Sequence, residues 1–166
     1  MRKLNVLLLL LFILTFTVMS VFADDAADVR AFFDKFVNAA NTYQDNLPSF
    51  YASNAKIIRY VIQKDGTLYP DPLIVDTQDY MKQLRINGKL AKLRNYKNLY
   101  KDINIAKTGS DYKISANRTP STSPNDKMPS YFIIGKDASG SYKIKEEMMQ
   151  TREQIFINQI KKQQRQ

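Results

Sequence analysis

Apolar residues recur at helical spacing from residue 25 onward. Steps of three and four residues predict an amphipathic helix of about 17 residues that begins near Asp25. Its apolar side would carry Val29, Phe32, Phe33, Phe36, Val37, Ala40 and Tyr43. Three phenylalanines on one side of a helix need a large apolar surface to cover them, and we expect a curved sheet to supply it.

The pattern then changes from helical spacing to strand-like alternation. Residues 56–64 are rich in β-branched side chains and end at Asp65-Gly66, which predicts a strand that enters a turn. A short helical turn at 48–51 precedes this strand. After a loop at 69–72, Asp76 or Thr77 would cap a helix in which Gly88 is a possible break. Alternation after Asn95 predicts four strands, at 100–107, 112–118, 130–135 and 141–151.

This order of elements predicts an α+β fold, with two or three N-terminal helices packed in a curved, mostly antiparallel sheet. Residues 1–23 have the three parts of a secretory signal peptide: basic Arg2 and Lys3, an apolar run, and small residues around Ala23. Residues 24–151 would form one domain. Residues 152–166 would form a basic polar tail, in which Ile155, Phe156 and Ile160 could line a frayed helix.

The N-terminal pattern decides the expected compartment. Cleavage after Ala23 would release a periplasmic or secreted bacterial protein without a stable membrane anchor, and retention of residues 4–23 as an anchor is the alternative. The net charge of the whole chain is +9, which often indicates a nucleic-acid partner. Because export separates the protein from nucleic acid, we expect no such partner.

Two residue types are missing from the composition. The chain has no cysteine and no histidine, so disulfides, thiolate nucleophiles and histidine-dependent catalytic or metal sites are excluded. We expect no metal and no cofactor. If the protein is an enzyme, Asp, Glu, Lys, Tyr or Arg must carry the chemistry.

Three stretches give the sequence a family resemblance. They are the helix start at 29–33, the passage from 47 to 56 into the first strand, and the closing stretch 140–147. Together they resemble the nuclear transport factor 2-like superfamily, which includes ketosteroid-isomerase-like and polyketide-cyclase-like (SnoaL-like) proteins. The resemblance covers nearly all of the chain after residue 23. It implies a cone whose open end forms an apolar pocket, and often a homodimer formed through the sheet.

Charged residues share strand faces with apolar ones. If alternation is unbroken, Arg59, Arg118 and Glu146 converge inside the cone with Tyr100 or Tyr131. This group could be a structural Arg-Glu bridge that closes the barrel, or it could bind a small anionic ligand, since a guanidinium suits carboxylate or phosphate.

The superfamily resemblance also implies an enzymatic alternative. Its enzymes use an aspartate base or an Asp-His pair in the pocket, but this chain lacks histidine and has no evident aspartate inside a predicted strand. A ketosteroid-isomerase-like or dehydratase-like reaction would need Glu146, Glu147 or Asp102 as the base, with tyrosine hydroxyls as donors to an oxyanion. We therefore favour a non-catalytic domain that binds a small ligand or serves in envelope assembly.

A basic stripe follows the second long helix. Spacings of three, four and three residues place Lys82, Arg85, Lys89 and Lys92 on one face. This surface could bind an anionic polymer or a membrane, or it could be a solvated helix face.

Overall fold

The computed structural model describes residues 25–152 and 154–163. The predicted signal peptide lies outside the described residues. The chain is helical from residue 25 to 41, and a short 3-10 helix, η1 (Leu47–Phe50), leads into the first strand. Pro48 stands in the first turn of η1, where its missing N–H is not needed.

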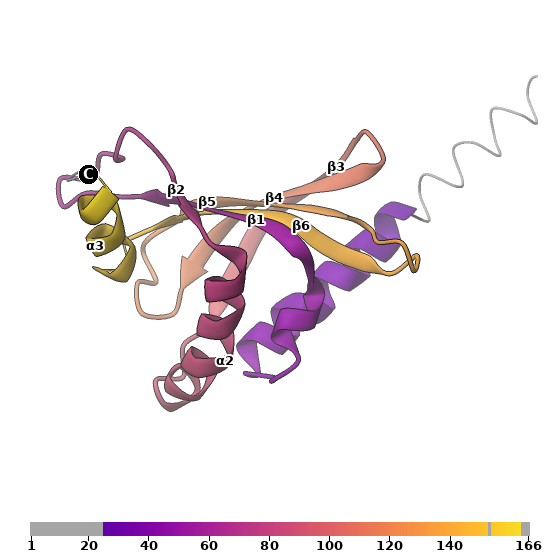
Figure 1. Ribbon diagram of the computed structural model, residues 1–166, viewed down its shortest axis with the longest axis horizontal. Helices are drawn as coiled ribbons and strands as arrows, with labels where there is room; N and C mark the ends of the chain where they lie inside the picture. Colours follow the sequence, from indigo (N-terminus) through magenta and orange to yellow (C-terminus); the bar gives the residue numbers. More distant parts are fainter. Residues whose placement is uncertain (1–24, 153, 164–166) are drawn as a thin grey trace, which may run out of the picture.

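The core is built on one six-stranded sheet. Its strands are β1 (Tyr51–Val61), β2 (Leu73–Val75), β3 (Asn98–Thr108), β4 (Asp111–Pro120), β5 (Met128–Lys136) and β6 (Tyr142–Thr151). Their order across the sheet is β2-β1-β6-β5-β4-β3. All neighbours are antiparallel except β1 and β6, which run parallel. The helices lie on one side of the curved sheet, as Figure 1 shows.

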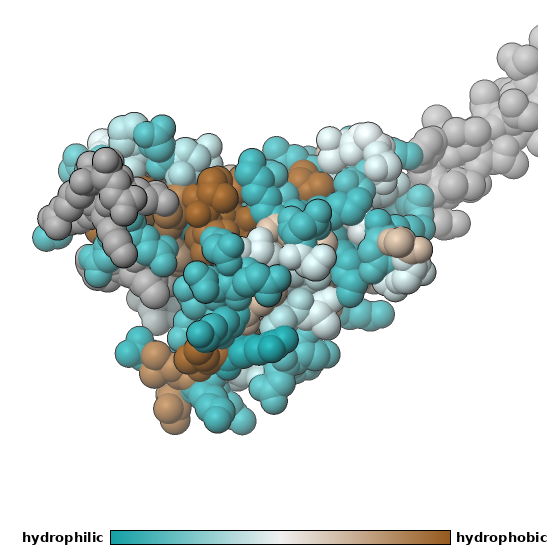
Figure 2. Space-filling view, viewed as in Figure 1, coloured by the Kyte–Doolittle hydropathy of each residue, from teal (hydrophilic) through white to brown (hydrophobic). Residues whose placement is uncertain are grey.

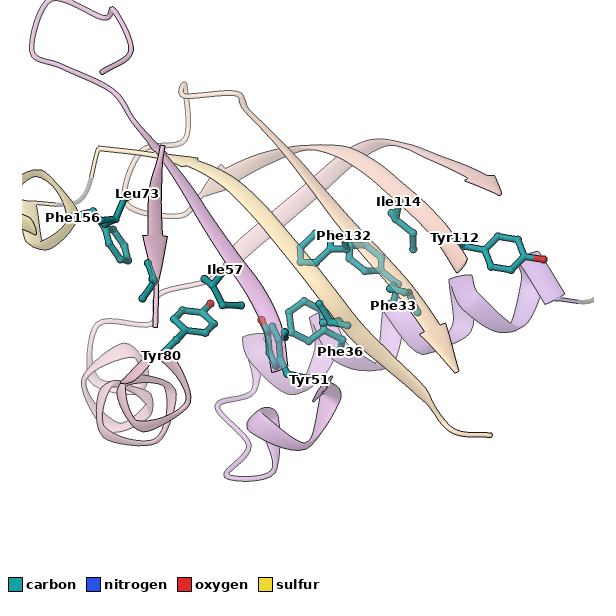
Figure 3. Packing of buried hydrophobic residues seen from close by; sticks show 14 of the residues in the cluster. Phe33, Phe36, Tyr51, Ile57, Leu73, Tyr80, Tyr112, Ile114, Phe132 and Phe156 are labelled. Carbon is teal, nitrogen blue, oxygen red and sulfur yellow. The ribbon is translucent and has the colours of Figure 1, made fainter. Parts of the chain in front are cut away.

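The N-terminal helix covers the inner face of the sheet with its aromatic stripe. The Phe33 and Phe36 rings face Phe132 on β5 (Figure 3), at 5.0 Å and 5.6 Å between ring centres. The Phe33 ring centre also lies 5.4 Å from that of Tyr100 on β3. Phe33 and Phe132 are completely buried. The sheet therefore supplies the apolar surface that three phenylalanines on one helix required.

The second long helix, α2 (Thr77–Leu93), begins where the sequence indicates. The side chain of Asp76 accepts a hydrogen bond from the backbone N–H of Asp79 at 2.9 Å, so Asp76 is the N-cap. The helix continues through Gly88 without a break, because a glycine inside a helix costs only about 1 kcal/mol.

Two elements differ from the sequence interpretation. The three-residue strand β2 was not predicted, because it is too short for alternation to be visible. Its residues pair with Ile57, Ile58 and Arg59 of β1. Residues Gln154–Gln163 form helix α3, and Phe156 and Ile160 are buried in the main core. The segment expected as a tail outside the domain thus contains an element of the core.

The fold class predicted from the order of elements is confirmed. Three described helices pack on a curved, mostly antiparallel open sheet. The four strands predicted after Asn95 match β3 to β6 closely, because the period-two alternation in β3, β4 and β5 reflects one apolar and one polar face. The strand predicted at 56–64 is displaced from β1, which runs from Tyr51 to Val61.

The contact between Phe33 and the sheet predicts a large effect on stability. Phe33→Ala should lower the free energy of unfolding by about 3–5 kcal/mol, since it leaves a cavity in a fully packed core. Urea denaturation measures this change. Leu93→Ala, at a side chain that is 85% exposed, is the control and should change the value by less than about 0.5 kcal/mol. Equal stability of both variants would contradict this position of the helix.

Candidate functional site

A cavity of about 700 Å³ lies on the inner side of the sheet. Its walls come from the end of the N-terminal helix, from α2, from the inner faces of the strands and from Phe156 of α3. The side chains that matter for its chemistry are Arg59, Tyr80, Tyr100, Arg118 and Glu147. Such a volume is typical of pockets for small organic molecules.

Glu147 is the centre of a buried polar cluster at the base of this cavity. Its side chain is fully buried, and both carboxylate oxygens accept hydrogen bonds. One oxygen accepts from the hydroxyl of Tyr51. The other accepts from the Arg59 guanidinium and, at 3.1 Å, from the hydroxyl of Tyr80. Figure 3 shows the Tyr51 and Tyr80 rings next to each other. Their ring centres are 5.8 Å apart.

The Arg59 guanidinium forms hydrogen bonds and aromatic contacts within this cluster. One guanidinium nitrogen donates to Glu147 and another to the backbone carbonyl of Ile58 at 2.9 Å. The guanidinium carbon lies 5.0 Å from the ring centre of Tyr80 and 5.6 Å from that of Phe156. Burial lowers the pKa of Arg59, but the Glu147 carboxylate raises it, and the result is a pKa above the ordinary arginine value.

Arg118 is the second buried guanidinium of the cavity, and it has a different set of partners. Nη1 donates to Asn98 Oδ1 at 2.8 Å and to the Tyr96 hydroxyl at 3.3 Å, and Nη2 donates to the Gln150 carbonyl at 2.8 Å. Nη2 also lies 3.6 Å from the sulfur of Met128. None of these described partners is a carboxylate. Nε is buried and has no hydrogen-bond partner among the described residues.

Three tyrosines around the cavity have a raised side-chain pKa. Burial raises the pKa of Tyr51 well above the ordinary value, and the negative charge of Glu147 raises it further. Burial raises the pKa of Tyr80 and Tyr100 as well, although Arg59 and Arg118 respectively act in the opposite direction. These hydroxyls are therefore neutral hydrogen-bond donors at neutral pH.

Three of the five residues predicted to converge do line the cavity: Arg59, Arg118 and Tyr100. Glu146 and Tyr131 do not. They lie on the outer face of the sheet, where the Tyr131 hydroxyl donates to Glu146 at 2.6 Å and Lys56 approaches the same carboxylate at 3.8 Å. The predicted place of Glu146 and Tyr131 inside the cone is therefore wrong.

A β-bulge in β6 is the physical reason for the error at Glu146. Ile134 pairs with Ile144, but Ile133 pairs with Glu146, so Lys145 is an extra residue without a partner. The extra residue reverses the alternation along β6. As a result Ile144 and Glu147, three positions apart, are both buried, and Glu146 points outward. For Tyr131, alternation in β5 puts its buried neighbours Ser130 and Phe132 on the inner face instead.

Asp102, the other alternative base, also lies outside the cavity. It is exposed on β3 and accepts a hydrogen bond from the Asn117 side chain at 2.8 Å. Its φ angle of 54° and the shift of register between Lys101 and Asn104 mark a second bulge. Asp tolerates this left-handed conformation better than most residues do.

Sequence reasoning missed the full role of Glu147 and its tyrosines. The sequence offers Glu147 only as an alternative base, places Tyr51 at the end of the predicted turn at 48–51, and places Tyr80 inside the helix predicted after Asp76. The one available signal was the adjacent pair Glu146-Glu147 within a predicted strand. Adjacent side chains of a strand point to opposite faces, so one of the two carboxylates has to face inward.

The predicted basic stripe lies on α2. Lys82, Arg85, Lys89 and Lys92 are all exposed, and Arg85 also borders the cavity. Among the described residues, no helix has the length and apolar character needed to cross a membrane. In the same part of the chain, no three acidic, histidine or cysteine side chains come together as a metal site would require.

Comparison with known proteins identifies the fold. No protein-family model and no curated protein matches the sequence. Among solved structures, a protein with a cystatin-like, NTF2-like fold from Novosphingobium aromaticivorans is similar at a TM-score of 0.59 and 6% identity, over 81% of this chain and 86% of that one. The chain has the nuclear transport factor 2-like fold.

Two further solved structures are similar over most of their length. A proposed ketosteroid isomerase from Shewanella frigidimarina has a TM-score of 0.51 and 15% identity, over 72% of this chain and 91% of that one. A chain from the complex of the yeast deubiquitinase Ubp3 with its cofactor Bre5 has a TM-score of 0.53 and 22% identity, over 74% of this chain and 92% of that one. At these identities the likeness concerns the fold alone.

The perturbed tyrosines predict a loss of stability at alkaline pH. The folded state raises the pKa of Tyr51, Tyr80 and Tyr100, so it favours their protonated forms. This stability is fully present below the unfolded-state pKa of about 10. Above it the free energy of unfolding should fall, by up to about 1.4 kcal/mol per pH unit for each tyrosine.

Urea denaturation at a series of pH values between neutral and strongly alkaline measures this slope. Tyr51→Phe should make the slope shallower, because it removes one of the three groups. Tyr69→Phe removes a tyrosine outside the Glu147 cluster and is the matched control. An unchanged slope in Tyr51→Phe would show that Tyr51 ionises as easily in the folded protein as in the unfolded chain.

Proposed function

We propose that this domain binds a small organic anion in its cavity and does not catalyse a reaction on it. The observation that carries this proposal is the environment of Arg118. The side chain is only 3% exposed and lines the cavity, yet none of its described hydrogen-bond partners is a carboxylate. A buried charge without a counterion is costly, and an acidic ligand would supply the missing charge.

The charges around the cavity favour an anion over a cation. Arg59 is neutralised by Glu147, whereas Arg118 is not paired in this way. Arg85 and Arg94 add positive charge where α2 borders the cavity. A guanidinium suits a carboxylate, phosphate or sulfonate group, because its planar N–H donors match the spacing of two acid oxygens.

The remaining walls describe the body of the ligand. Phe36, Leu84, Tyr100, Met128 and Met149 give the cavity an apolar and aromatic lining. Methionines adapt to irregular shapes, and aromatic rings offer flat surfaces for stacking. These features support an amphipathic ligand with an apolar or aromatic body and one acidic end.

The geometry of Glu147 favours binding over the isomerase or dehydratase alternative. A tyrosine pair next to a deep carboxylate is what that alternative requires, and Glu147 has this pair. However, the same carboxylate forms an ion pair with Arg59, and both of its oxygens already accept hydrogen bonds. Neither oxygen is therefore left without a protein donor with which a substrate would have to compete.

We further propose that the domain acts outside the cytoplasm, in the periplasm or beyond the cell. The sequence pattern of residues 1–23 supports this compartment. A role in envelope assembly is the alternative, and it would use the outer surfaces of the domain. It would not account for a buried Arg118 in the cavity wall, so we favour ligand binding.

A matched pair of fluorescent probes tests the anion site. Anilinonaphthalene sulfonate and phenylnaphthylamine share an aromatic body, and only the first carries an acid. The wild-type protein should bind the sulfonate more tightly. Arg118→Gln should weaken sulfonate binding by about 10- to 100-fold, which corresponds to a hydrogen bond between charged groups, and should change binding of the neutral probe little.

Arg30→Gln is the control for the lost charge, since Arg30 is exposed on the N-terminal helix and pairs with Asp34 at 3.0 Å. It should leave both affinities unchanged. Thermal unfolding of each variant establishes that it is folded. Equal loss of both probes in a folded Arg118→Gln protein, or no loss of either, would contradict the proposal.

We also propose that two copies of the chain associate through the outer face of the sheet. Ile74, Ile58, Met148 and Tyr131 form one row across four strands of this face. Ile74 is 51% exposed. Lys56, Lys113 and Glu146 stand beside the row, so the face carries both signs of charge and can complement its own copy across a twofold axis.

Sedimentation equilibrium tests this association. The wild-type protein should be a dimer, and Met148→Glu should raise the dissociation constant by at least about tenfold by placing a charge at the centre of the apolar row. Leu93→Glu adds the same charge on exposed α2 and should have no effect. A wild-type protein that stays monomeric at all concentrations tested would exclude the dimer.

A further inference from the structure

Helix α2 presents an apolar stripe to solvent along one flank, beside its cavity-facing side. Ile86, Leu90 and Leu93 are 61%, 45% and 85% exposed, and their spacing of four and three residues aligns them along one side of the helix. Figure 2 shows apolar surface at the lower tip of the molecule, where Figure 1 draws the end of α2. Three large apolar side chains in a row on one exposed helix favour an interaction site over chance exposure.

The basic stripe of α2 runs next to the apolar one. Lys82, Arg85, Lys89 and Lys92 follow each other at steps of three, four and three residues. No ion pair joins any of them to a carboxylate among the described residues. The acidic residues Asp76, the N-cap, and Asp79 lie at the first turn of the helix, just before the stripe begins at Lys82.

The apolar and basic stripes together favour a lipid bilayer over a soluble anionic polymer as the partner of α2. A nucleic acid or an acidic glycan would use the four basic side chains but would leave Ile86 and Leu93 in water. A bilayer that contains anionic lipids offers negative headgroups and, just below them, an apolar layer. An amphipathic helix with both stripes matches that order of chemistry.

From this match we infer that α2 docks the domain reversibly on the surface of an anionic lipid bilayer. Ile86, Leu90 and Leu93 enter the boundary between headgroups and acyl chains, and the basic stripe contacts the headgroups. Arg85 and Leu90 also border the cavity, so docking places the cavity next to the lipid headgroups. The docking goes beyond ligand binding and does not depend on Arg118.

Vesicle flotation tests this inference on a chain that starts at Asp25. This chain keeps every described element of the fold and lacks the apolar run 4–23, which would bind lipid by itself. We expect binding to phosphatidylcholine vesicles that contain phosphatidylglycerol, and much weaker binding to phosphatidylcholine alone. Added salt should weaken the interaction, because it screens the basic stripe.

Two variants separate the contributions of the stripes. Ile86→Ser with Leu93→Ser should weaken binding by at least about tenfold, since two apolar side chains no longer enter the bilayer. Lys82→Gln with Lys89→Gln should weaken it by about 25-fold, or roughly fivefold for each charge near the surface. All four side chains are exposed, so the variants should unfold at the temperature of the wild-type protein.

Matched controls carry the same substitutions elsewhere. Leu68→Ser alters an exposed apolar residue in the loop between β1 and β2, and Lys64→Gln with Lys127→Gln removes two exposed charges from loops. The apolar control should bind vesicles like the wild type. The lysine control should bind only slightly more weakly, because it lowers the net positive charge by two. Arg118→Gln should also bind vesicles normally, which distinguishes this inference from the ligand proposal.

Three outcomes would overturn the inference. The first is no binding to vesicles that contain phosphatidylglycerol. The second is equal loss of binding in the α2 variants and in their controls, which would indicate a general charge effect. The third is binding of a soluble polyanion, such as heparin, by a protein that does not bind vesicles, which would assign the basic stripe to an anionic polymer.

Discussion

The buried pair of Glu147 and Arg59 is the constraint on which the inner side of the sheet depends. Two opposite charges have been removed from water, and such a pair is tolerated only when its remaining hydrogen-bonding capacity is satisfied. Tyr51, Tyr80 and the Ile58 carbonyl meet this need. The start of β1, the middle of β6 and helix α2 must therefore keep their relative positions.

This cluster divides the inner face into two regions. Next to it, Phe33 and Phe36 of the N-terminal helix fill the space over Phe132 and exclude water. Beyond it, α2 and Phe156 border a cavity of about 700 Å³. The polar side chains of the Glu147 cluster form hydrogen bonds with one another along the cavity wall. They do not interdigitate with an opposing layer as the phenylalanines do, and a cavity remains on this part of the inner face.

Much of the fold was predictable from the sequence, whereas the site was predictable only in part. The helix stripe from Val29 to Ala40, the Asp76 cap and the alternating strands are local patterns, and each of them was found, although Tyr43, the last predicted member of the stripe, lies beyond the end of the helix. Arg59, Arg118 and Tyr100 followed from uninterrupted alternation. Glu146 and Asp102 did not, because each lies at or beside a bulge, and a bulge depends on how two strands pair. Tyr51 and Tyr80 reach Glu147 across 96 and 67 residues, a distance that no local pattern reports.

The sequence by itself determined the class of the fold, the absence of cysteine and histidine chemistry, and the aromatic helix that needs a sheet. These properties depend on composition and on spacing within one element. Only the tertiary structure decided that Glu147 and not Glu146 faces inward, that Arg118 lines the cavity without a carboxylate among its described hydrogen-bond partners, and that Phe156 belongs to the core. Each of these depends on the register between strands or on contacts between distant elements, since one extra residue in β6 is enough to exchange its two faces.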